Sequence, residues 1–252
     1  MKAKPVCSPA AAPFLADAAC FAASALLISL IDGQFQAIPQ RDEASASLWR
    51  EIRDGGAWFW KHRLLRTLGI MAGVVNFYST AGFSIFVLVA QDRLGLSPVE
   101  YGLVLSAGAV GGVLAGLSAE RLNRRLGTGG VLFLTNFLPA IAYVVIAQSS
   151  HAGVLAAMFI LLSFSPMVGN VLLISLRQVI IPDRLLGRVT SAYRLFALGA
   201  VPAGALVGGF LALRFGLTAP YWMAAAVMGV MAFALLPVVN NRTLAAARQA
   251  AQ

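Results

Sequence analysis

The sequence predicts an all-α membrane protein, a polytopic bundle of six transmembrane helices preceded by one further helix. Of its 252 residues, 59% are hydrophobic and only 12% are charged, which is too little charge to cover a water-soluble fold of this size. A helix needs about 20 consecutive apolar residues to cross the bilayer core. Stretches of that length without Asp, Glu, Lys or Arg are residues 67–91, 101–119, 126–176, 195–213 and 215–241.

The elements follow in chain order. Residues 1–31 form an N-terminal tail and a first helix, although this helix contains Asp17. Residues 32–63 form a linker, in which apolar residues recur near helical spacing from residue 48 onward and predict an amphipathic helix on the membrane face. Residues 64–240 hold the six helices, because the run 126–176 must be two helices that turn at residues 148–151. Residues 241–252 form a tail.

Basic residues alternate between successive loops. The linker region carries six, the following loops carry one, three, none, four and one, and the tail carries two. Because basic residues gather in cytoplasmic loops, this alternation predicts a multi-pass protein of the cell (cytoplasmic) membrane whose C-terminus is cytoplasmic. The net charge of +9 therefore reflects topology, and we expect no nucleic-acid partner.

Residues typical of catalytic and metal sites are scarce. The two histidines, His62 and His151, belong to loops that the predicted topology places on opposite sides of the membrane. The two cysteines fit neither a disulfide framework nor a metal site, and the sequence has no Gly-x-Ser-x-Gly elbow. An intramembrane enzyme is therefore disfavoured, and we expect no enzyme activity, no cofactor and no metal.

The loop after the third helix carries an ordered set of charges. Residues 116–125 read Gly-Leu-Ser-Ala-Glu-Arg-Leu-Asn-Arg-Arg. This segment resembles the loop signature of the major facilitator superfamily, in which a glycine is followed by an acid, a base, a second glycine and two bases. Asn123 replaces that second glycine, and we expect it to adopt a positive φ. The resemblance implies a cytoplasmic gate that contains Gly116, Glu120, Arg121, Arg124 and Arg125, whereas the alternative is that the arginines only determine topology.

A second region, residues 170–189, resembles the same superfamily where its tenth helix runs into its eleventh. The match is to an exporter branch that includes enterobactin-exporter-like proteins, although Leu186 stands where an arginine is usual. The resemblance adds Asp183 and Arg188 to the gate. The matching residues are Asn170, Gln178, Pro182, Asp183, Gly187, Arg188 and Val189.

The resemblance extends over about residues 13–240 and identifies the chain as similar to a C-terminal transporter half. It implies that the first helix corresponds to the sixth of the superfamily, so that an N-terminal half is missing, separately encoded, or replaced by a second copy of this chain. Small residues at four-residue spacing on two helices predict close packing against protein, which the resemblance places on the opposite half. The packing glycines are Gly108, Gly112, Gly204 and Gly208.

A substrate cavity is expected near the middle of the membrane, where polar side chains are costly to expose to lipid. The residues proposed to line it are Asn76, Tyr78, Thr80 and Phe83 on the second helix and Ser163 and Asn170 on the fifth. Their polar groups can equally bond across helices and line nothing. Asn136 is interpreted as structural, while Arg177 and Arg194, at the inner ends of their helices, are expected to extend to the interface.

The resemblance implies a function: efflux of a small organic molecule by alternating access, as half of a secondary transporter. The alternative is a non-transporting fragment, or an assembly partner that needs a separate N-terminal half. The expected partners are the lipid bilayer, a small-molecule substrate, and the other half or a second copy. From residue 67 onward, no predicted helix carries an Asp or Glu near its centre.

Overall fold

A computed structural model describes residues 12–30, 48–237, 240–241 and 243. Nearly all of them lie in helices, and no strand occurs among them, which confirms the predicted all-α fold. The chain divides into two units, residues 1–46 and 47–252. The first unit contains α1 (Ala12–Ser29), an apolar helix of 18 residues that corresponds to the predicted first helix.

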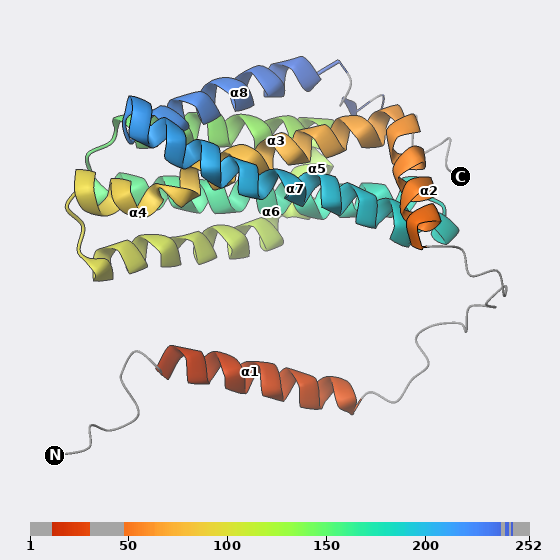
Figure 1. Cartoon of the computed structure of the whole chain (residues 1–252), viewed down its shortest axis with the longest axis horizontal. Helices are drawn as coiled ribbons and strands as arrows, with labels where there is room; N and C mark the ends of the chain where they lie inside the picture. The colour runs from red at the N-terminus through yellow and green to blue at the C-terminus, as the bar shows by residue number, and fades with distance from the viewer. Residues whose placement is uncertain (1–11, 31–47, 238–239, 242, 244–252) are drawn as a thin grey trace. The chain divides into compact units, whose positions relative to one another are not determined.

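The second unit holds the remaining helices (Figure 1). Helix α2 (Leu48–Lys61) leads into α3 (Arg63–Ser84), which continues through α4 (Phe86–Leu88) and η2 (Val89–Arg93) as a single span. Then come α5 (Pro98–Gln148), α6 (Ala152–Ile180), α7 (Asp183–Phe215) and α8 (Ala219–Leu235). In the described residues, four spans are long and apolar enough to cross a membrane, and α8 is a shorter apolar helix.

Helix α5 is two transmembrane helices joined at a bend. Its 51 residues would make a straight helix of about 75 Å, more than twice the roughly 30 Å of a bilayer core. Gly127, with φ 70° and ψ 165°, breaks it into residues 98–126 and 128–148. With this break, the described part of residues 64–240 forms six helical segments, and the turn at residues 148–151 is where the sequence predicted it.

The bend corrects the prediction for Asn123. Among the described residues, no residue other than glycine has a positive φ, so Asn123 is helical and Gly127 makes the turn. Asn123 instead accepts a hydrogen bond from the Thr128 hydroxyl at 3.0 Å, which bridges the break. Residues 116–125, which the sequence suggested to be a loop, are therefore the end of a helix. The turn itself needs only one residue with a positive φ, Gly127, which carries no Cβ.

Close packing between helices rests on glycines. Helix α7 lies along α3, and an added Cβ at Gly204 or Gly208 would fall on the carbonyl oxygens of Phe77 and Ala81. At Gly108 it would lie 2.7 Å from the Ser163 hydroxyl of α6. These three glycines therefore pack within this chain, whereas the resemblance placed their faces toward another half.

Gly112 contacts no described residue of another helix in this chain, so its packing against another half stays a prediction. An added Cβ at Gly112 or Gly116 would meet no described atom within 4 Å, whereas one at Gly111 would fall on the carbonyl oxygen of Ile160. Positions three apart lie on one helix face as closely as positions four apart. The glycines that face α6 are consequently Gly108 and Gly111.

Helix α2 docks onto the bundle beside the start of α7 (Figure 1). Phe59 is 2% exposed, and its ring packs at 6.2 Å from that of Tyr193 on α7. An added Cβ at Gly55 would lie 2.8 Å from the carbonyl oxygen of Arg188. The predicted amphipathic helix is present, and its Phe59 face covers α3 and α7 rather than lipid, because Gly55 and Gly69 admit close approach.

Candidate functional site

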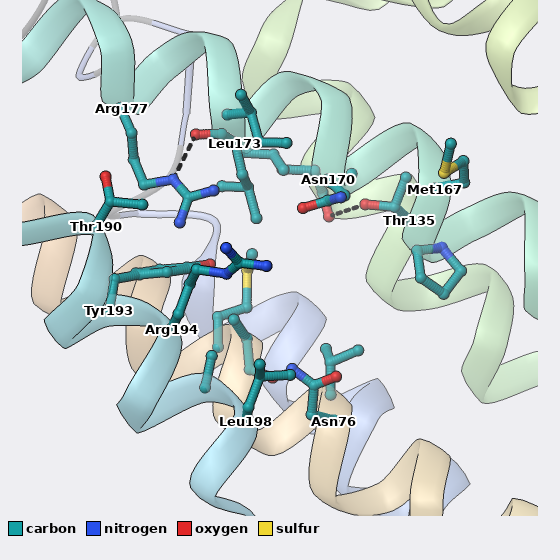
Figure 2. A pocket seen from close by; sticks show the side chains of 18 of the residues that line it. Asn76, Thr135, Met167, Asn170, Leu173, Arg177, Thr190, Tyr193, Arg194 and Leu198 are labelled. Atoms are coloured by element: carbon teal, nitrogen blue, oxygen red, sulfur yellow. Dashed lines mark hydrogen bonds between the residues drawn. The ribbon is translucent and has the colours of Figure 1, made fainter. Parts of the chain in front are cut away.

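A cavity of about 1050 Å³ lies among α3, the second half of α5, α6 and α7 (Figure 2). Apolar side chains form much of its wall, among them Met71, Leu132, Leu173 and Leu198. Helix α3 contributes the residues around Met71 and α5 those around Leu132, while α6 and α7 supply most of the other lining residues. The cavity is therefore built from four helices that are separate in sequence.

The structure places three of the six predicted cavity residues here. Asn76, Ser163 and Asn170 line the cavity. Asn76 donates a hydrogen bond to the carbonyl oxygen of Ala72 at 3.0 Å, while Asn170 makes no hydrogen bond to a described residue and is exposed. Asn170 thus has its full hydrogen-bonding capacity available on the cavity side.

Tyr78, Thr80 and Phe83 are not among the described lining residues. The cavity lies beside residues 71–76 of α3, and these three follow at increasing distance along the helix. Tyr78 packs against an apolar cluster around Tyr143, and Phe83 is exposed and stacks on Phe159 with 6.4 Å between ring centroids. Each residue of a helix advances about 1.5 Å along its axis, so these three residues lie progressively farther from the cavity than Asn76 does.

Three buried polar atoms at the cavity have no hydrogen-bond partner among the described residues. They are Asn136 Oδ1, Ser165 Oγ and Arg177 Nη1. A buried polar atom without a partner costs about 1–3 kcal/mol. Asn136 anchors itself by donating to the carbonyl oxygen of Leu132 at 2.6 Å, which leaves its own oxygen unpaired. The structural role that the sequence suggested for Asn136 is therefore incomplete, because this residue also lines the cavity.

Arg177 corrects the expectation that its side chain extends to the interface. Only 7% of it is exposed, and its guanidinium carbon lies 4.0 Å from the ring centroid of Tyr193 on α7. Its Nε donates a hydrogen bond to the carbonyl oxygen of Leu173 at 3.2 Å. A cation over an aromatic face is electrostatically favourable, so Tyr193 holds Arg177 inside the bundle. Arg194, also on α7, is exposed and lines the same cavity.

A family model described as transmembrane secretion effector, within the major facilitator superfamily, matches residues 6–251. The chain belongs to this family. Among curated proteins it is similar to the multidrug efflux pump Tap of Mycolicibacterium fortuitum, with 26% identity over 210 residues, which are 81% of this chain and 50% of that pump. The chain spans about half the length of this relative. These matches confirm the resemblance to the major facilitator superfamily, and together with the long apolar helices they support a multi-pass membrane protein.

The residues predicted to form a cytoplasmic gate lie near the ends of two helices. Glu120 and Arg124 form an ion pair of 3.8 Å on the surface of α5, and Arg121 and Arg125 are exposed beside them. They occupy the last helical turns before Gly127, while Gly116 has open space around it.

The second group of predicted gate residues lies at the start of α7. Asp183 is the first residue of that helix, and its side chain lies outside the described residues. Arg188 is exposed, and its backbone contacts α2 at Gly55. The gate role of both groups stays a prediction.

Asn241 is a residue of this site region that the sequence did not reveal. Its Oδ1 accepts a hydrogen bond from Gly129 N at 2.7 Å, and its Nδ2 donates to the carbonyl oxygen of Leu126 at 3.0 Å. One side chain thus satisfies backbone groups on both sides of the bend in α5, where each helix end leaves such groups unpaired. No local sequence signal indicates this role, because residues 126 and 241 are far apart in the chain.

No group of three or more His, Cys, Asp or Glu side chains in the described part of the chain is arranged to hold a metal ion. The described cavity lining offers amide, hydroxyl and guanidinium groups. Such a lining can bind a small molecule by hydrogen bonds, charge and apolar contact.

Proposed function

We propose that this chain forms one helix bundle of a secondary transporter, which exports a small organic molecule by alternating access together with a second bundle. The observation that carries this proposal is the cavity of about 1050 Å³, whose wall holds three buried polar atoms that have no hydrogen-bond partner among the described residues. Ligand pockets for drug-sized molecules have volumes of about 300–1000 Å³. Asn136 Oδ1 and Ser165 Oγ would gain hydrogen bonds from a bound substrate, which offsets the cost of burying them.

Export is supported by the family and by the relative. The family is described as one of transmembrane secretion effectors, and the pump Tap is named as a multidrug efflux pump. At a finer level, the motifs at residues 116–125 and 170–189 resemble the C-terminal half of the enterobactin-exporter-like branch. Because the basic loops alternate, we place the protein in the cell membrane with its C-terminus in the cytoplasm.

The second bundle is proposed to be an N-terminal transporter half or a second copy of this chain. Alternating access needs two bundles that rock against each other around a site between them. The chain covers 50% of Tap, whose length therefore leaves room for another bundle of similar size.

The test is a chimera in which the N-terminal bundle of Tap precedes residue 47 of this chain. Cells that express it are loaded with Nile red, ethidium or carboxyfluorescein, which are neutral, cationic and anionic dyes, and dye retention is followed after energisation. We expect the chimera to lower the retention of at least one dye. The chain alone is expected to lower none unless it forms a dimer, which native mass spectrometry detects.

A matched pair of variants tests the role of the cavity. Asn170→Trp places a large ring in the cavity, whereas Leu206→Trp replaces a side chain that is 76% exposed on α7 and does not line it. We expect Asn170→Trp to abolish dye export and Leu206→Trp to retain it, at equal membrane expression. Equal export by both variants would overturn the proposal. A folded chimera that exports no dye would favour the alternative, a non-transporting assembly partner.

A further inference from the structure

We infer that the cavity binds the anionic group of an amphiphilic organic acid through Arg177 and Arg194. This inference rests on the proposed function and names the substrate class of the same cavity. It starts from the state of the two guanidinium groups, which Figure 2 shows facing the space between α6 and α7.

Arg177 is the primary recognition group. It is more than nine-tenths buried, and its Nη1 has no hydrogen-bond partner among the described residues. The contacts to Leu173 and Tyr193 use its Nε and its flat face, and neither Nη nitrogen donates a hydrogen bond to a described residue. The edge formed by the two Nη groups carries parallel N–H donors, which match the two oxygens of a carboxylate.

Arg194 adds a second positive charge on the opposite wall. It lines the cavity from α7, and neither Arg177 nor Arg194 forms a salt bridge with a described residue. The described lining residues include no Asp or Glu, so the wall supplies no counter-charge of its own. Two like charges at one site repel each other, and an anion between them removes that repulsion. A buried charge without a partner is costly, which favours an anionic ligand over a neutral one.

The rest of the lining indicates that the acid has an apolar body. The apolar side chains that line the same cavity include Met71, Leu132, Leu173, Ile174 and Leu198. The cavity volume of about 1050 Å³ exceeds what a small inorganic anion needs. An organic acid with a carboxylate at one end and a hydrophobic ring system at the other satisfies both regions at once.

The experiment compares two ligands with the same pyrene body, 1-pyrenebutyrate, which ends in a carboxylate, and 1-pyrenebutanol, which ends in a neutral hydroxyl group. The full 252-residue chain is placed in phosphatidylcholine nanodiscs, and binding is measured by equilibrium dialysis against empty nanodiscs. A bidentate contact between arginine and carboxylate predicts that the acid binds about tenfold more tightly than the alcohol. Equal affinities for the two ligands would overturn the inference, even if the chimera exports a neutral or cationic dye.

Three arginine variants assign the preference to the cavity. Arg177→Gln and Arg194→Gln are each expected to reduce the preference for the acid over the alcohol to about twofold or less, since each removes one positive charge. Arg214→Gln also removes one charge, at the last turn of α7 away from the described lining, and is expected to keep the tenfold preference. If Arg177→Gln does not fold, the variant of the exposed Arg194, Arg194→Gln, is compared with Arg214→Gln instead. A preference that survives both cavity substitutions contradicts the inference.

A further measurement distinguishes an organic acid from an anionic lipid headgroup as the ligand, because both are negatively charged. The measurement is repeated in nanodiscs that contain phosphatidylglycerol. An unchanged preference supports the organic acid as ligand. Loss of the preference would mean that anionic lipid occupies the arginines, which overturns the organic-acid assignment.

Discussion

At the residue scale, two adjacent glycines of α5 have opposite surroundings. Gly111 lies against the backbone of α6 at Ile160, whereas Gly112 faces open space. Consecutive residues on a helix point about 100° apart, so a close helix contact constrains one of them and not the other. The effect of an added methyl group is therefore expected to differ sharply between these neighbours.

We predict that Gly111→Ala destabilises the bundle by about 1–3 kcal/mol, because the new methyl group would overlap the Ile160 carbonyl and push α5 from α6. Gly112→Ala is the matched control, and we expect it to be neutral or to stabilise by up to about 1 kcal/mol, as alanine favours a helix. Denaturation by dodecyl sulfate, followed by circular dichroism, measures both. Similar losses in the two variants would contradict the assignment of Gly111 as the contact residue.

Asn241 offers a second prediction at this scale. Asn241→Ala removes both hydrogen bonds that hold the bend at Gly127, and we expect a loss of about 1–3 kcal/mol. Asn241→Asp keeps the acceptor for Gly129 N and loses the donor to Leu126, so its loss is expected to be smaller. Thermal unfolding in detergent gives the stabilities, and protease cleavage near residue 127 reports local opening. Unchanged cleavage in Asn241→Ala would show that the bend does not depend on this side chain.

At the element scale, the junction between α2 and α3 depends on His62. Its Nδ1 accepts a hydrogen bond from Leu65 N at 3.4 Å and thereby caps α3. Desolvation by burial lowers the pKa of His62 below its ordinary value. Because α2 docks through Phe59 just before this residue, the cap connects the docked helix to the start of the first span.

The lowered pKa of His62 predicts a pH dependence of stability. The unfolded chain binds the proton more readily than the folded chain, so the contribution of His62 is present above about pH 6.5 and is lost as the pH falls through the lower folded-state pKa. We therefore expect the thermal unfolding midpoint to decrease as the pH is lowered below about 6.5. His62→Asn can cap the helix without titrating and is expected to lack this component. Identical pH profiles for the two proteins would exclude His62 as the cause.

At the scale of the whole molecule, the alternation of basic loops predicts which ends of the helices face the cytoplasm. Single cysteines are introduced at Ser150 and Glu120 in a chain whose Cys7 and Cys20 are replaced by serine. A membrane-impermeant maleimide is expected to label Ser150→Cys in intact cells and Glu120→Cys only after permeabilisation. The reverse pattern would invert the topology and place the C-terminus outside.

Much of the fold could be predicted because transfer into lipid is a property of each residue, summed over a stretch of chain. The uncharged run 126–176 predicted two helices and the turn at residues 148–151 in this way. The position of the bend could not be predicted by the same reasoning. It depends on Gly127 being the residue without a Cβ and on Asn241, which reaches the bend from the end of the chain.

The sequence by itself determined that this is a membrane helix bundle of the major facilitator superfamily, since hydropathy and the signature loops are local patterns. Only the tertiary structure decided that Gly111 rather than Gly112 meets α6, that Arg177 turns inward onto Tyr193, and that Asn136 lines the cavity. Each of these depends on which helix lies opposite, and such neighbours come from distant parts of the chain. Packing between helices is a property of residue pairs, which no local pattern contains.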